Sequence, residues 1–135
     1  MIRGGNCEFR FNLPYNFSDL VTAQIYFWQD GYNGPSNDRP LPILKILEQC
    51  EPNSNNPKEL RVTLHQEETL RFTDKRKARV QLRAVTDTGI PIISKTQLFA
   101  VYPSYDDAIL DEEVWPTPDY NGWVILDGER VTQEV

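Results

Sequence analysis

Few residues in this chain could do chemistry, and their spacing favours no reaction. There is a single histidine, His65, and there are two cysteines, Cys7 and Cys50. A lone imidazole excludes a pair of histidine ligands, and two distant cysteines lack the spacing of a zinc knuckle. Nucleophilic catalysis needs a serine or cysteine beside a base, and no Gly-x-Ser-x-Gly segment is present. We therefore expect a protein that is not an enzyme, with no catalytic residues, no cofactor and no metal.

Adjacent carboxylates are the next candidates, because paired acids hydrolyse glycosides and clustered acids bind calcium. They occur at Glu67–Glu68, at 106–107 and at 111–113. Nothing in the pattern indicates a cleft around any of them, and the C-terminal clusters lack the glycine turn of an EF-hand loop. We interpret all three as solvated charge.

Basic side chains form the clearest electrostatic feature. Residues 75–77 read Lys-Arg-Lys, and Arg79 and Arg83 follow in a segment where polar and apolar residues alternate. Alternate residues of a strand share one face, so Arg79 and Arg83 are predicted to lie together on a polar face. That face could meet phosphate or carboxylates, or it could serve only to keep the sheet soluble.

Acidic residues are concentrated near the C-terminus. Residues 1–103 carry 13 basic and 11 acidic side chains, a net charge of +2. Residues 104–135 carry nine acidic side chains and one basic one, a net charge of −8, which gives the total of −6. We therefore divide the chain into a body, 1–103, and an acidic aromatic arm, 104–135. The net negative charge argues against nucleic acid as the main partner.

Aromatic residues distinguish the arm from a plain solvating tail. Trp115, Tyr120 and Trp123 lie among its carboxylates. Such anchors suggest docking on another subunit, although they could also fold back on the chain's own body. With Arg79 and Arg83, these three are the predicted partner-binding residues.

A short hairpin is predicted inside the arm, at 123–132. Two β-prone segments there flank Asp-Gly at 127–128, a dipeptide that suits a tight hairpin turn. Because an isolated hairpin is marginal in water, we expect it to lie on the body or to extend a sheet edge of a neighbouring copy.

The body must position these residues, and its pattern is that of strands. Polar and apolar residues alternate over 8–13, 21–28, 59–64 and 78–84, and further strands are expected at 43–47 and 94–102. Ten prolines and seven glycines argue against a helical bundle. We predict an all-β fold, an immunoglobulin-like antiparallel β-sandwich of about seven strands with an extended C-terminal arm.

Two irregular features interrupt the strands. Residues 64–72 predict a single helical turn that carries the chain from one sheet to the other. Residues 30–40 and 51–58, rich in Asn, Pro, Gly and Ser, are predicted to be long loops. Loops of this kind carry recognition or are tolerated insertions.

Targeting signals are missing from the pattern. No apolar run approaches the roughly 20 residues that span a bilayer, so no membrane partner is expected. The opening residues form no apolar signal region, so we do not expect classical secretion. Two free thiols are the expected state in a reducing cytoplasm.

The order of the segments resembles a family of small proteins encoded by bacteriophages and prophages, notably of gut bacteria. The chain opens Met-Ile-Arg-Gly, continues with Leu-Pro-Tyr at 13–15, and carries Leu-His-Gln-Glu-Glu-Thr at 64–69 before the Val-Gln-Leu-Arg-Ala strand at 80–84. Family members typically show Leu-Pro-Phe, Leu-Thr-Gln-Glu-Asp-Thr and Val-Gln-Ile-Arg-Val at these places. The resemblance covers residues 1–113. The loop 33–40 is longer than in the family, and residues 114–135 extend past its usual end.

The resemblance implies a phage context and a structural role in the virion, and it implies no catalytic residues. We therefore expect a multi-copy subunit of the capsid surface, neck or tail, made in the host bacterial cytoplasm and residing in the virion. Its expected partners are other virion structural proteins and copies of itself. The alternative is a host-surface or carbohydrate-binding module on the virion, which would use Tyr26, Trp28, Tyr32 and the loop 30–40.

Overall fold

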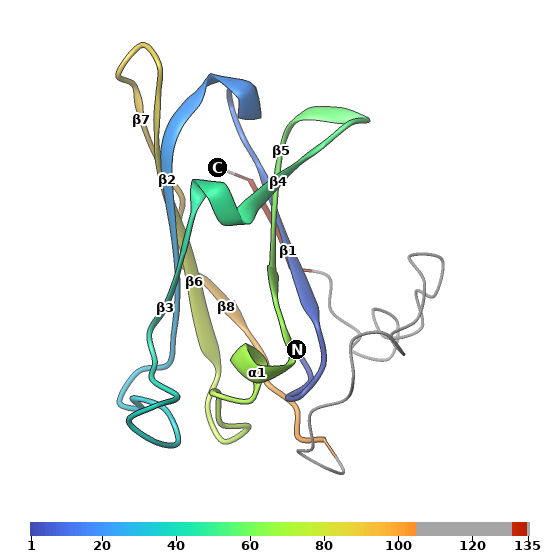
Figure 1. Ribbon diagram of the computed structural model, residues 1–135, viewed down its shortest axis with the longest axis vertical. Helices are drawn as coiled ribbons and strands as arrows, with labels where there is room; N and C mark the ends of the chain where they lie inside the picture. The colour runs from blue at the N-terminus through green and yellow to red at the C-terminus, as the bar shows by residue number, and fades with distance from the viewer. Residues whose placement is uncertain (105–130, 135) are drawn as a thin grey trace.

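The computed structural model describes residues 1–104 and 131–134 of the 135-residue chain. The described residues form two β-sheets with very little helix (Figure 1). The strands are β1 (Cys7–Asn12), β2 (Leu20–Trp28), β3 (Ile43–Ile46), β4 (Cys50–Asn53), β5 (Asn56–Leu64), β6 (Ala78–Thr86), β7 (Pro91–Ile93), β8 (Gln97–Phe99) and β9 (Val131–Glu134). Three short helical turns join them, η1 (Phe17–Asp19), η2 (Leu47–Gln49) and α1 (Gln66–Thr69). The prediction of an all-β fold is confirmed.

The two sheets have distinct strand orders. One sheet has the order β4-β5-β1-β9, and the other has the order β3-β2-β6-β7, with β8 also paired to β6. β7 and β8 lie one after the other along the same edge of β6, opposite Arg83–Val85 and Ala78–Val80. Among the described strands, every pairing is antiparallel except that of β9, which runs parallel to β1.

The core lies between the sheets because the strands from β1 to β8 turn buried apolar side chains inward. Phe9 and Phe11 of β1 are fully buried, as is Phe27 of β2 in the opposite sheet. The ring of Phe9 meets Phe27 at 4.9 Å and Phe99 at 5.0 Å between centroids, both edge to face. Figure 1 shows the sheets facing one another along their length, with β2, β3, β6 and β8 on one side and β1, β4 and β5 on the other.

The predicted helical turn is α1, and it joins the two sheets as expected, since β5 and β6 belong to different sheets. Glu68 fixes its start by accepting a hydrogen bond from the backbone N–H of His65 (3.0 Å). Thr69 is fully buried; its hydroxyl accepts from the N–H of Gly4 (2.9 Å) and donates to the carbonyl of Gly5 (2.8 Å). The N-terminal segment is thereby held against this crossing.

One loop prediction and one strand prediction are wrong. The long loop expected at 51–58 is a hairpin of β4 and β5, in which Asn53 and Asn56 accept hydrogen bonds from the N–H groups of Asn55 and Lys58. Asparagine marks the turn through such local bonds, although the same composition is typical of loops. Within the range 94–102, where one strand was expected, only β8 is a strand, and β7, which the pattern did not indicate, lies before this range.

The two cysteines are free and buried, and they lie in the same sheet. Cys7 is opposite Leu64 and Cys50 is opposite Val62, so β5 separates the strands that carry them. Two strand spacings amount to about 10 Å, which is beyond the reach of a disulfide. No helix among the described residues is long and apolar enough to cross a membrane.

Candidate functional site

The outward side of the five-stranded sheet carries the predicted basic residues and is the most distinctive surface of the described chain. We call it the outer face. Its residues are Gln24, Tyr26, Trp28, Leu44, Ile46, Arg79, Gln81, Arg83, Ile93 and Leu98. Strand register sets them in rows: Tyr26 lies between Leu44 and Gln81, and Arg83 lies between Gln24 and Ile93.

Four aliphatic side chains of the outer face are exposed to solvent. Ile93 is 59% exposed, Leu98 46%, and Leu44 and Ile46 42% each. They surround tyrosine, tryptophan, arginine and glutamine side chains, and none of the outer-face residues is acidic. Aromatic residues and arginine are enriched at the centres of protein interfaces, whereas aspartate, glutamate and lysine are depleted. The composition of the outer face therefore resembles that of protein interfaces.

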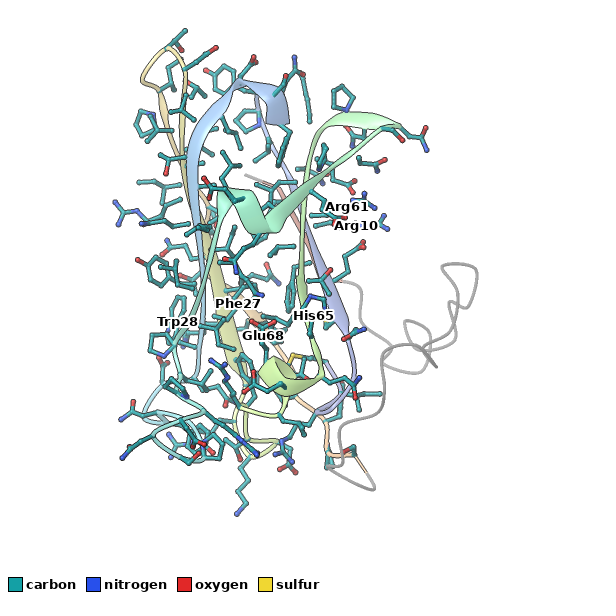
Figure 2. The ribbon with its side chains drawn as sticks, in the orientation of Figure 1. Arg10, Phe27, Trp28, Arg61, His65 and Glu68 are labelled. Carbon is teal, nitrogen blue, oxygen red and sulfur yellow. The ribbon has the colours of Figure 1, made fainter. Side chains whose placement is uncertain are left out.

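A hollow of about 360 Å³ opens at the end of the outer face where β2 leads into the loop 29–42. Tyr26 and Trp28 form its floor together with Gln81 and Arg83 of β6. The loop supplies the remaining lining residues, Gln29, Tyr32, Asn33, Leu41 and Pro42. Figure 2 shows Phe27 pointing between the sheets and the neighbouring Trp28 pointing away from them. Because successive side chains of a strand point to opposite faces, Phe27 lies in the core while Trp28 lies on the outer face.

Gln29 anchors the wall of this hollow. Its side chain is 3% exposed and donates to the carbonyls of Thr73 and Arg76, both at 2.8 Å, while accepting from the N–H of Thr73 at 2.8 Å. A buried amide with this many partners holds its neighbours firmly, because each unmade bond would cost desolvation energy. The end of β2 is therefore tied to the segment before β6.

Asp30 accepts hydrogen bonds from one tryptophan and two arginines. Its carboxylate accepts from Trp28 Nε1 at 3.2 Å and from Arg79 Nε at 2.8 Å. Its backbone carbonyl accepts from Arg76 Nη1 at 2.6 Å. The carboxylate is 66% exposed, so the ion pair with Arg79 adds little stability and mainly sets side-chain orientation. Through these contacts with Asp30, Arg76 and Arg79 hold the start of the loop 29–42 in place.

The predicted partner-binding residues fall into two groups. Arg79 and Arg83 share the outer face, as expected, but Arg79 is held by Asp30 whereas Arg83 faces the hollow. Trp115, Tyr120 and Trp123 lie outside the described residues. Of the predicted hairpin, only residues 131 and 132 are described, and both belong to β9.

The sequence analysis did not single out three residues of the outer face and the hollow. Ile93 was missed because β7 is too short for its alternation to be recognised, and Leu98 fell in a predicted strand but was not assigned to this face. Gln29 was missed because its role depends on contacts with a segment more than 40 positions away. Asparagine and proline in the loop 30–40 were the available signal for a recognition surface.

The hollow offers amide and guanidinium groups beside aromatic rings. Within the two described ranges, no group of three or more His, Cys, Asp or Glu side chains could hold a metal ion. Burial raises the pKa of the Cys50 thiol to about 12, so this cysteine stays protonated and unreactive.

Comparison with known proteins adds no identification. No protein-family model matches the chain, and no curated protein matches it.

Proposed function

We propose that this chain is a non-enzymatic structural protein of a bacteriophage particle, present in many copies at the capsid surface, neck or tail. Its body would be an immunoglobulin-like sandwich over 1–103, and residues 104–135 would form an arm that contacts neighbours. Two facing antiparallel sheets and a helical turn that crosses between them are consistent with that fold. The resemblance of residues 1–113 to small phage-encoded proteins supports the setting.

The observation that carries the proposal is the outer face. Four exposed aliphatic side chains and two aromatic ones share it with two arginines, across strands that the core holds rigidly in register. A face of this composition loses unfavourable contact with water when another protein covers it. The net charge of −8 on residues 104–135 would complement the arginines of a neighbouring copy.

Charge reversal on the outer face tests the proposal. Arg83→Glu places a carboxylate among groups that would meet acidic residues, so fewer copies should enter purified particles. Lys58→Glu, an exposed position on β5 of the opposite sheet, is the matched control and should assemble normally. The folded fraction of each variant is checked by circular dichroism. Normal incorporation of a folded Arg83→Glu protein would contradict the proposed role of this face.

A host-surface or carbohydrate-binding module is the second candidate, and the hollow is the observation that favours it. Tyr26, Trp28 and Tyr32 all line it, and sugar rings stack on aromatic faces while amides bond their hydroxyls. Screening the protein and its Trp28→Ala variant on a glycan array separates the two functions. If the parent binds a glycan and Trp28→Ala does not, the binding module is favoured. If the parent binds no glycan and is incorporated into particles normally, the structural role is favoured.

A further inference from the structure

Exposed sheet edges pair readily with other chains, and most edges in the described structure are protected against this. β3 is an edge strand, and its Lys45 points inward, with a side chain only 7% exposed. Lys45 Nζ lies 2.7 Å from Glu68 Oε2 and 2.9 Å from Glu68 Oε1. An inward-pointing charge on an edge strand opposes pairing with a foreign strand, because that charge needs its own partner.

The other edges are protected by proline and by shortness. β4, at the edge of the four-stranded sheet, contains Pro52, which has no N–H to donate. β7 begins with Pro91, and β7 and β8 have three residues each. Strands this short offer little backbone for a new ladder.

β1 has none of these protections. It contains no proline, and its inward-facing residues, Phe9 and Phe11, are apolar and fully buried. Its first edge pairs with β5 along all six residues. Its second edge is covered by β9, with Phe9 opposite Val131 and Asn12 opposite Glu134. The unprotected edge is thus occupied by the C-terminal strand of the same chain.

We propose that this edge of β1 is a strand-acceptor site whose partner in the assembled protein is residues 131–134 of a second copy. Twenty-six residues, 105–130, separate β9 from the body. A chain of that length spans at most about 90 Å, whereas a domain of about 100 residues has a radius of gyration of about 13 Å. The same strand can therefore reach the β1 edge of an adjacent copy.

Concentration decides between the two arrangements, since the pairing is the same in both. A tethered strand meets its own edge at an effective concentration on the order of millimolar. In dilute solution the strand therefore occupies its own β1, whereas neighbours packed in an array compete at similar concentrations. Exchange of an identical element is a low-cost route to linked subunits. This inference rests on the proposed function only for the crowding of copies.

Cysteine cross-linking in solution tests the exchange without any particle. A chain with Asn12→Cys is mixed with a chain carrying Glu134→Cys at millimolar concentration, incubated under mild oxidation and run on a non-reducing gel. Positions 12 and 134 are register partners, so exchange brings their Cα atoms within disulfide range. Asn12→Cys mixed with Thr132→Cys is the off-register control, two residues away.

The expected result is a linked heterodimer from the in-register mixture, several-fold stronger than from the off-register one and fading on dilution to micromolar protein. The double variant Asn12→Cys/Glu134→Cys reports the pairing itself and should form an intrachain bond when dilute. An intrachain bond without any heterodimer at millimolar protein would overturn the exchange and leave the proposed function standing. Absence of both bonds would overturn the acceptor site.

Discussion

Single substitutions in the ion pair of Lys45 and Glu68 test whether this pair is a buried constraint on the edge strand β3. Its side chains are 7% and 17% exposed, and Lys45 Nζ lies within 3 Å of both carboxylate oxygens. Glu68→Gln leaves the ammonium buried without a counter-charge. Breaking a fully buried pair in this way costs about 3–5 kcal/mol, and the partial exposure of Glu68 favours the low end, about 3 kcal/mol. For a chain of this size, that corresponds to a fall in Tm of roughly 10 °C.

The reverse substitution is expected to cost less. In Lys45→Met the remaining carboxylate is nearer to water and keeps the hydrogen bond from the N–H of His65, so we expect a loss of about 1 kcal/mol. The double variant Lys45→Met/Glu68→Gln buries no unpaired charge and should unfold within about 1 kcal/mol of the parent. It also removes the protective charge from β3, so it should self-associate where the parent does not.

Urea denaturation followed by circular dichroism measures the four free energies of unfolding, and light scattering measures self-association. The double-mutant cycle should give a coupling energy of about 3–4 kcal/mol. If both single variants lose less than about 0.5 kcal/mol, the range of exposed surface pairs, the pair is not a buried constraint. A double variant that stays monomeric at high concentration would refute the protective role of Lys45.

Three further predictions concern local structure. A Cβ at Gly34, where φ is +102°, would lie 2.2 Å from the carbonyl oxygen of Arg39. Gly34→Ala should therefore lower the free energy of unfolding by over about 2 kcal/mol and disturb the hollow. Gly89 has a φ of +82° but open space around it, so Gly89→Ala should lower the free energy of unfolding by only about 1 kcal/mol. Thr69→Val removes the hydrogen bonds that a fully buried hydroxyl makes to the backbone of Gly4 and Gly5, and it should cost about 1–3 kcal/mol in urea denaturation. The pKa of Cys50 is raised from 9.0 to about 12, so the thiol of the folded protein should resist iodoacetamide at pH 9. The free energy of unfolding should fall between pH 9 and 12, because the thiol ionises in the unfolded chain before it does so in the folded one. This fall should be less steep in Cys50→Ala. Rapid native alkylation of Cys50, or equal costs for the two glycine variants, would contradict these expectations.

Much of the fold could be predicted because the core strands alternate cleanly. Residues such as Phe9, Phe11 and Phe27 fall on inward positions, and period-two alternation alone assigns them to the core. Arg79 and Arg83 were placed on one face by the same rule. The helical turn before β6 could be identified because it breaks that rule for a few residues and then restores it.

The remaining features depend on contacts that local pattern does not contain. β4 was missed because Pro52 and the asparagines around it are typical of loops, and only pairing with β5 makes the segment a strand. The hollow depends on Gln29 joining β2 to a distant segment. The inward position of Lys45 contradicts the usual preference of lysine for water, and its partner on α1 explains it.

The most direct test of the proposed function is the number of copies of this protein in purified, intact phage particles. Quantitative mass spectrometry against the major capsid protein gives that ratio. A structural subunit predicts many copies in a fixed ratio that survives high-salt washing and is the same in independent preparations. Absence from the particles, or a trace amount that washing removes, would contradict the structural role.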